Sequence, residues 1–302
     1  MDQHRTLPHD LKIHVVEVLG DAGVIWLDGL PDVIRQIENE WSVKVDEPFA
    51  AGEFNFVAPA MSSLYGDVVI KIAPPFPDGE FFSEIAYLKH QDGRGCVLVL
   101  AEDRVLRAMM LERAVPGRNL VEEFAEREAD SIAPAIACLR RIDCDSPDAA
   151  NDVIYLDRWF DGLKRYKGTD FPHSYAEAAL GLYETLSAAS ELRYIHGDFH
   201  LGNVVTAQRE PYLAIDPKGI VGYLGYDIAV FLNNYYRWQE SRADVRAQLE
   251  RAVGHFADAF RMTRAEVEGW CYAVAVLGAW WTFDEMPALY SGGVARADVW
   301  NI

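Results

Sequence analysis

The sequence contains few cysteines, and none of them is spaced to build a metal or redox centre. The four cysteines of the 302-residue chain include no C-x-x-C pair, which argues against a zinc site or a thioredoxin-like motif. We therefore expect buried free thiols in a reducing compartment. The N-terminus lacks a signal-peptide core and the chain has no apolar run of 18 residues, so we expect no membrane segment. These absences favour a cytoplasmic protein.

Positive charge is also scarce. The chain has 28 Lys and Arg residues against 47 Asp and Glu residues, which gives a formal net charge of −19. This balance argues against a nucleic-acid partner, because such binding depends on cationic side chains that neutralise phosphates. An acidic cleft would instead concentrate a cationic small molecule. The alternative, that the charge only keeps the protein soluble, stays open.

The first third of the chain predicts a small antiparallel sheet with one main helix. A helical lead-in is expected at residues 31–41, with Pro31 in its first turn. Gly66 and Asp67 separate two apolar runs, which is typical of a hairpin. Phe81–His90 has the pattern of a helix, and two further strands are expected at 96–101 and 107–113.

A Pro-Gly pair at residues 116–117 marks the point where the predicted secondary structure changes from mainly strands to mainly helices. Beyond it, helical patterns dominate. The expected helices are 119–142, 147–166, 174–192, 226–238, 243–260 and 263–281. We therefore predict an α+β protein with an N-terminal lobe over residues 1–113 and a larger, mostly helical lobe over residues 114–302.

One stretch, Tyr194 to Tyr226, carries most of the chemical information. It contains His196-x-Asp198-x-x-x-x-Asn203, an apolar run, a turn, and a second apolar run that ends on Asp216. This order predicts a loop, a hairpin of two strands, and a carboxylate directly after the second strand. Asn203 and Asp216 offer the oxygen ligands that Mg²⁺ prefers. Asp198 is then placed to accept or orient the proton of a substrate hydroxyl.

Two charged residues in the first lobe complete a set for phosphoryl transfer. Lys71 interrupts an apolar strand, where strand periodicity puts it on one face with Val69 and Ala73. Glu84 lies beside the apolar face of the helix over 81–90 and is placed to contact Lys71. The alternatives are an edge-strand lysine that limits aggregation and a solvated helix carboxylate. A lysine, its glutamate, two metal ligands and a catalytic carboxylate are the parts that phosphoryl transfer requires.

The chain resembles the aminoglycoside phosphotransferase branch of the protein-kinase-like superfamily, and within it the streptomycin 6-phosphotransferase group of aminoglycoside/hydroxyurea resistance kinases. The likeness rests on Leu192–Asn203, on Ile215–Gly222 and on the helical segment Cys271–Trp281. It implies a two-lobed kinase-like fold that binds ATP between the lobes and works with Mg²⁺, with GTP not excluded. The residues after Asp216 are Pro, Lys and Gly, and the role of Lys218 is unexplained.

The resemblance also implies roles for individual residues. Lys71 would contact the α- and β-phosphates and Glu84 would hold it, while a hinge at residues 111–114 would offer backbone groups to the adenine. The remaining implied or candidate positions are Glu112 and Ala114 in the hinge, Gly52 and Asn55 in a glycine-poor phosphate loop, Asn203 and Asp216 on Mg²⁺, Asp198 as the catalytic residue, and His196 and Asp227 as structural supports.

The expected acceptor is a hydroxyl group of a small, cationic molecule of the streptomycin type. Asp284, Glu285 and Trp281 are candidate contacts. The alternatives are a solvated helix end for the two carboxylates, and a place in the core for Trp281, which is the commoner position of a tryptophan. Two other hypotheses stay open. The first is a metabolic kinase of a sugar or amino alcohol on the same scaffold, and the second is an inactive nucleotide-binding protein.

Overall fold

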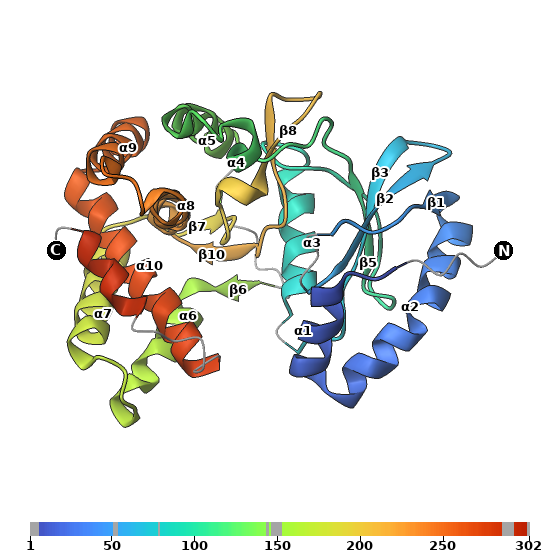
Figure 1. Ribbon diagram of the computed structural model, residues 1–302, viewed down its shortest axis with the longest axis horizontal. Coiled ribbons are helices and arrows are strands. Elements are labelled where there is room, and N and C mark those ends of the chain that lie inside the picture. The colour runs from blue at the N-terminus through green and yellow to red at the C-terminus, as the bar shows by residue number, and fades with distance from the viewer. Residues whose placement is uncertain are drawn as a thin grey trace.

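The chain folds into a smaller part built on a sheet and a larger helical part, which lie side by side (Figure 1). This computed structural model describes residues 6–50, 54–77, 79–142, 145, 153–285 and 293–300. The predicted α+β class, with a small antiparallel sheet and a larger helical part, is confirmed. The boundary between residues 113 and 114 stays a prediction.

The smaller part is a five-stranded antiparallel sheet in the order β1-β2-β3-β5-β4. Its strands are β1 (Val43–Val45), β2 (Phe56–Ser62), β3 (Gly66–Ile72), β4 (Val99–Asp103) and β5 (Ala108–Glu112). The predicted hairpin is present, with Ser62 paired to Gly66 across the turn.

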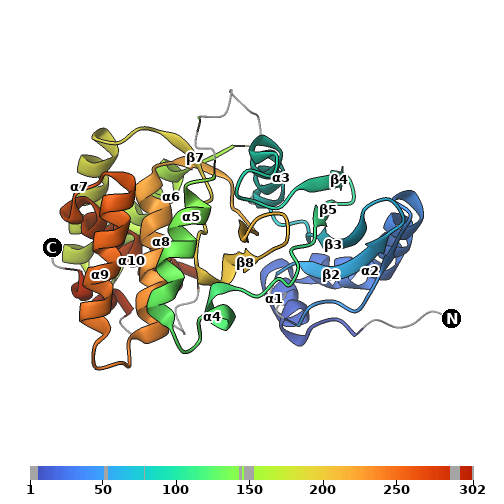
Figure 2. The same ribbon diagram turned by 90° about the horizontal axis from the view of Figure 1, so that it is seen from above.

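Helices cover both faces of this sheet. On one face, Val68 and Ile70 of β3 pack in a core with helices α1 (His9–Leu19) and α2 (Asp21–Glu40). The opposite face carries Lys71 and lies against α3 (Glu80–Gln91) (Figure 2). The alternation predicted for this strand is therefore confirmed, and it directs Lys71 between the sheet and α3.

Two expectations for the first lobe were wrong. The lead-in contains two helices, and Pro31 lies inside α2 instead of at its start. The buried residues Leu30, Ile34 and Ile37 anchor α2 to the sheet, and this burial outweighs the hydrogen bond that Pro31 cannot donate. The strand expected at 96–101 begins three residues later, because Cys96 pairs with Ala214 of the other part.

The larger part contains mostly helices. They are α4 (Leu120–Glu123), α5 (Ile132–Leu139), α6 (Leu156–Leu163), α7 (His173–Ala188), α8 (Leu224–Gln239), α9 (Val245–Phe260) and α10 (Arg264–Glu285), with 3₁₀ turns η1 (Glu128–Ser131), η2 (Lys164–Gly168), η3 (Leu201–Asn203) and η5 (Gly293–Val299). The short strands are β6 (Ile154–Tyr155), β7 (Arg193–Ile195), β8 (Val204–Thr206), β9 (Tyr212–Ala214) and β10 (Ile220–Gly222). No helix among the described residues is long and apolar enough to cross a membrane.

The helix expected over 119–142 is broken into α4, η1 and α5. Arg127 has non-helical backbone angles, and the Ser131 hydroxyl donates to the Glu128 carbonyl at 2.6 Å. Such local hydrogen bonds compete with a continuous helix. The helix expected over 147–166 partly lies outside the described residues, and β6 precedes α6 where helix was expected.

The expected buried thiols are present at three positions. Cys96, Cys138 and Cys271 are free and buried, and burial raises the pKa of each of them. Cys144 lies outside the described residues. The three thiols are therefore small apolar core groups without reactive character.

Close contact between α8 and α10 depends on a glycine. A Cβ atom added at Gly225 would lie 2.2 Å from Cδ1 of Trp270, which is fully buried. We therefore expect Gly225→Ala to lower the free energy of unfolding by about 1–3 kcal/mol, because overpacking forces the helices apart. Gly181, on the exposed side of α7, has no atom within 4 Å of an added Cβ.

The matched variant Gly181→Ala is expected to raise the free energy of unfolding by about 0.5–1 kcal/mol, since alanine favours a helix. Urea unfolding followed by circular dichroism measures both variants. Equal stability of the two variants would show that α8 and α10 are not packed this closely.

Candidate active site

A hairpin brings the two predicted metal ligands together. β8 pairs with β9 so that Val204 faces Ala214, and the Ile215 amide donates to the Asn203 carbonyl at 2.9 Å. Asn203 therefore lies opposite Ile215, one residue before Asp216. The predicted order of loop, strand, turn and strand is confirmed, and its register explains why these distant residues share a site.

Asp198 and Asn203 are joined within the loop. The Asn203 side-chain amide donates to the Asp198 carbonyl at 3.0 Å and approaches the Asp198 carboxylate at 3.4 Å. Because its nitrogen is used in this way, Asn203 has its amide oxygen to offer a cation. The Asp198 carboxylate is about one-third exposed, so a substrate can reach it.

His196 is a neutral, buried support of the loop. Its Nδ1 atom accepts from the Asp198 amide at 3.2 Å, so its Nε2 atom carries the proton and donates to the Ile215 carbonyl at 3.0 Å. Burial lowers the pKa of His196 to about 3. The ring therefore ties the segment that carries Asp198 to the segment that carries Asp216.

Asp227 fixes the same loop from the first turn of α8. Its two carboxylate oxygens accept from the amides of His196 and Gly197 at 2.8 and 2.7 Å. Burial raises the pKa of Asp227 to about 7, and the two amide donors oppose this rise. The residue is 1% exposed, so solvent cannot replace these bonds.

Lys71 lies at the centre of a buried ion-pair cluster. Its ammonium contacts both oxygens of Glu84, at 2.7 and 2.6 Å, and also one oxygen of Asp216. Lys71 and Glu84 are 4% and 5% exposed. Burial alone would lower the pKa of Lys71, but the two carboxylates raise it above its usual range. The lysine is therefore charged, and neither edge-strand lysine nor solvated glutamate describes this pair.

Asp216 opens toward solvent from this cluster. Its side chain is 55% exposed, and its backbone is left-handed, with φ of 57°, a conformation that Asp tolerates better than most residues. The Lys71 ammonium lowers the pKa of Asp216 to about 2. Asp216 is therefore an exposed, ionised carboxylate.

Three residues at the site were not foreseen as a group. Lys218 forms an ion pair with Glu80, which lies one helical turn before Glu84 on α3. His200 accepts from the Gly202 amide through Nδ1, and its Nε2 lies 3.8 Å from Asp198. A signal for Glu80 was its four-residue spacing from Glu84, whereas nothing in the sequence pointed to the orientation of His200.

The hinge candidates lie at the junction of the two parts. The carboxylate of Glu112 accepts two hydrogen bonds from Arg209, at 2.8 and 2.9 Å. The Glu112 amide also donates to the Leu98 carbonyl at 2.9 Å, so both its side chain and its amide are engaged within the protein. Asn55 is half-buried in the loop before β2, and Gly52 lies outside the described residues.

The acceptor candidates occupy the end of α10. Asp284 pairs with Arg165, and Trp281 packs edge-on against Trp159 with ring centroids 5.4 Å apart. Trp159 in turn contacts Tyr226, the sequence neighbour of Asp227. Trp281 and Trp159 are partly exposed and Tyr226 is buried, so this row of rings leads from α10 to the turn of α8 that supports the loop of Asp198. The side chain of Glu285 is not described.

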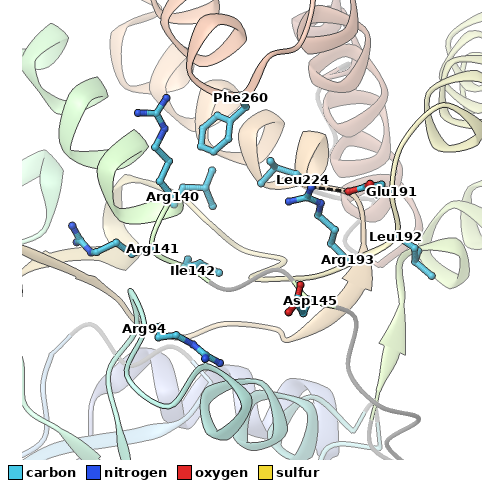
Figure 3. Close-up of a pocket in the computed structure, with 11 residues that line it drawn as sticks. Arg94, Arg140, Arg141, Ile142, Asp145, Glu191, Leu192, Arg193, Leu224 and Phe260 are labelled. Atoms are coloured by element: carbon cyan, nitrogen blue, oxygen red, sulfur yellow. Dashed lines mark hydrogen bonds and ion pairs between the residues drawn. The ribbon is translucent and has the colours of Figure 1, made fainter.

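A cavity rich in arginine lies apart from these residues (Figure 3). It has a volume of about 780 Å³, and Arg94, Arg140, Arg141 and Arg193 line it. Each guanidinium already has a partner, namely the carbonyls of His90, Ala259 and Tyr212 and the carboxylate of Glu191. These arginines serve local structure, and we assign the cavity no ligand.

The donor set of the hairpin suits a hard divalent cation. Asp216 supplies an exposed carboxylate and Asn203 an amide oxygen, whereas the described residues contain no cluster of three His, Cys, Asp or Glu side chains that could hold a metal. Mg²⁺ usually takes one or two protein oxygens together with substrate phosphates. Asn203 and Asp216 therefore fit Mg²⁺ bound with a nucleotide.

Comparison with known sequences gives consistent matches. The family model described as aminoglycoside/hydroxyurea antibiotic resistance kinase matches residues 57–285. A streptomycin 6-kinase of Streptomyces glaucescens is 26% identical over 295 residues, which covers 92% of this chain and 91% of that protein. A hydroxyurea phosphotransferase of Kitasatospora aureofaciens is 28% identical over 72% of this chain and 65% of its own.

Solved structures share the fold at low sequence identity. An aminoglycoside phosphotransferase from Streptomyces rimosus, solved with ADP and streptomycin, superposes with a TM-score of 0.58 at 15% identity over 83% of this chain and 98% of its own. A choline kinase from Streptococcus pneumoniae gives a TM-score of 0.58 at 15% identity over 89% and 96%. At this identity the likeness shows the fold alone.

The buried, neutral state of His196 predicts a pH dependence of stability. Because the folded pKa of about 3 lies below the usual 6.5, the unfolded chain binds the extra proton first. Stability from this group is complete above pH 6.5 and is lost as the pH falls toward 3, by about 1.4 kcal/mol per pH unit in that window.

Urea unfolding between pH 5 and 7.5 measures this contribution as the difference in free energy of unfolding between the wild type and His196→Gln. Gln cannot titrate, so the two stability curves should converge as the pH falls below 6.5. Parallel curves would contradict a buried neutral histidine.

Proposed function

The chain belongs to the aminoglycoside/hydroxyurea antibiotic resistance kinase family, and we propose that it transfers the γ-phosphate of ATP to a hydroxyl group of an aminoglycoside of the streptomycin type. The observation that carries this proposal is the joining of Lys71, Glu84 and Asp216 beside the loop of Asp198 and Asn203. This set has the parts of a phosphoryl-transfer site. A cytoplasmic location, where ATP is available, is part of the proposal.

In this proposal the nucleotide lies between the two parts of the chain. Lys71 contacts the α- and β-phosphates, and Glu84 holds its ammonium in place. The backbone of Glu112 and Ala114 receives the adenine, and Asn55 and Gly52 belong to the loop over the phosphates. The buried Lys71–Glu84 pair supports this role, since a lysine fixed by one carboxylate can present its charge to an anion at little entropic cost.

Asn203 and Asp216 would hold Mg²⁺, which when bound neutralises phosphate charge and aligns the phosphates. The charge of the site supports this assignment. Two ammonium groups, Lys71 and Lys218, lie among the carboxylates of four acidic residues, Glu80, Glu84, Asp198 and Asp216. A triphosphate adds further negative charge to this cluster, so a divalent cation is needed to bind it.

Asp198 would be the catalytic residue. In the transfer step the acceptor oxygen forms a bond to the γ-phosphorus, the bond from that phosphorus to the β–γ bridging oxygen breaks, and the hydroxyl proton passes to Asp198. Burial raises the pKa of Asp198, and the neighbouring His200 and Lys218 oppose this rise. Its side chain is about one-third exposed, so an acceptor hydroxyl can reach it. His196 and Asp227 hold the loop that carries it.

The acceptor is assigned from charge and from the relatives. Streptomycin-type molecules are cationic, and a chain with a net charge of −19 attracts cations. Trp281 and Asp284, with Glu285 beside them, would border the acceptor. Trp281 and Trp159, which pack edge to face, are aromatic rings of the kind that attract a guanidinium group. Asp284 would exchange its exposed partner Arg165 for a ligand cation.

Asp198→Ala is expected to abolish phosphoryl transfer and to leave nucleotide binding intact. The loss of the proton acceptor should lower kcat at least about 100-fold, whereas Lys71, Asn203 and Asp216 still bind MgATP. Turnover assays with isothermal titration calorimetry measure the two properties separately. Near-wild-type turnover of this variant would contradict the assigned mechanism.

The proposed acceptor is tested by an ATP-consumption screen of the wild-type enzyme. Streptomycin and other aminoglycosides, hydroxyurea, choline, ethanolamine and common sugars are the acceptors, and Asp198→Ala provides the blank. We expect consumption with a streptomycin-type aminoglycoside. Consumption restricted to a sugar or an amino alcohol would replace the resistance role with a metabolic one.

A further inference from the structure

Lys218 is anchored directly to the catalytic loop. Its amide donates to the His196 carbonyl at 2.8 Å, and the amide of Gly219 donates to the same carbonyl at 3.1 Å. His196 is two residues before Asp198, and Lys218 is two residues after Asp216. The backbone of Lys218 therefore joins the two segments that carry these carboxylates.

The side chain of Lys218 runs from this loop to α3. A Cβ atom added at Gly197 would lie 3.0 Å from the Cβ atom of Lys218, so the side chain starts against the residue before Asp198. It ends on the Glu80 carboxylate. The side chains of Lys218, Glu80 and Asp198 are 36%, 37% and 33% exposed, so the ammonium lies in a partly open region beside the catalytic loop.

A purely structural role explains this arrangement poorly. The loop is already attached to α3, because the Ser83 hydroxyl donates to the Lys218 carbonyl at 2.7 Å. Gly219 also packs closely on α3, since an added Cβ would lie 2.4 Å from the Ser83 carbonyl oxygen. An ion pair this exposed adds at most about 1 kcal/mol to stability. The charge itself is the feature left to explain.

We propose that Lys218 contacts the phosphoryl group as it passes from the nucleotide to the acceptor, and that Glu80 holds the ammonium in position for this contact. The inference rests on the proposed function. Lys218 forms no covalent bond and gives up no proton. Its ammonium offsets the negative charge of the phosphoryl oxygens while the phosphoryl group lies between Asp198 and Asp216. Loss of one such group in other enzymes slows turnover about 100- to 1000-fold.

The influence of Lys218 on its neighbours supports this placement. Its positive charge lowers the pKa of Asp198 and of Asp216, in each case as one of several contributions. One ammonium thus acts on both carboxylates that flank the transfer path. Lys71 is buried, whereas Lys218 is partly exposed and acts on Asp198 together with His200, whose Nε2 lies 3.8 Å from that carboxylate.

The test compares the binding of MgADP with and without aluminium fluoride, which mimics a phosphoryl group in transfer. For the wild type, fluoride complex formation should tighten ADP binding. In Lys218→Met this gain in ADP affinity should be at least 10-fold smaller than in the wild type, and Lys218→Arg should restore much of it. The affinity of both variants for MgADP alone should stay within about threefold of the wild-type value. Calorimetry needs no acceptor for this comparison.

Two further variants separate charge from structure. Lys89→Met removes an ion pair with Glu102 at the other end of α3 and should behave as the wild type. Glu80→Gln keeps the ammonium and should lose less of the fluoride gain than Lys218→Met. An undiminished gain in Lys218→Met would overturn the inference. The inference would also be overturned if Lys218→Met and Glu80→Gln lost equal amounts of the fluoride gain and showed equal falls in melting temperature. That result would mean that the ion pair only stabilises the fold. Failure of the wild type to bind MgADP would instead contradict the proposed function.

Discussion

The ion pair between Lys71 and Glu84 is the constraint on which the rest of the site depends. A lysine that is 4% exposed in the middle of a sheet requires a counter-charge. Helix α3 supplies it and must therefore lie across that face of the sheet. Asp216 joins the same ammonium from the other part of the chain. Removal of one partner would strand a buried charge, at a cost of about 3–5 kcal/mol, so the pair links stability to the geometry of the site.

Backbone hydrogen bonds provide the second level of order. Asp227 accepts from two amides of the loop that carries Asp198, and His196 ties that loop to Ile215, next to Asp216. The carboxylate of Asp198 is therefore positioned by groups that are themselves buried. This arrangement is what a site needs when its reactive groups must stay partly exposed.

Sequence patterns predicted those site residues whose positions depend on their own strand or hairpin. Strand alternation placed Lys71, and the apolar runs around Asn203 predicted the hairpin that carries Asp216. Contacts between segments far apart in the sequence could not be predicted in this way, because the periodicity of one segment carries no information about its partner. The pairing of Lys218 with Glu80 joins residues 138 positions apart, and Pro31 is tolerated in α2 through burial of its neighbours. The surroundings of Trp281 depend on helix packing in the same way, so the acceptor is the least predictable feature.

The most direct test of this account is the affinity of Lys71 variants for ATP and for adenosine, which lacks phosphates. Lys71→Met is compared with Lys71→Met/Glu84→Gln, in which no buried carboxylate is left unpaired. Calorimetry should find ATP affinity lowered at least 10-fold in the double variant, with adenosine affinity within about twofold of the wild type. Equal ATP affinity in the wild type and the folded double variant would contradict the claim that this buried pair exists to bind nucleotide phosphates.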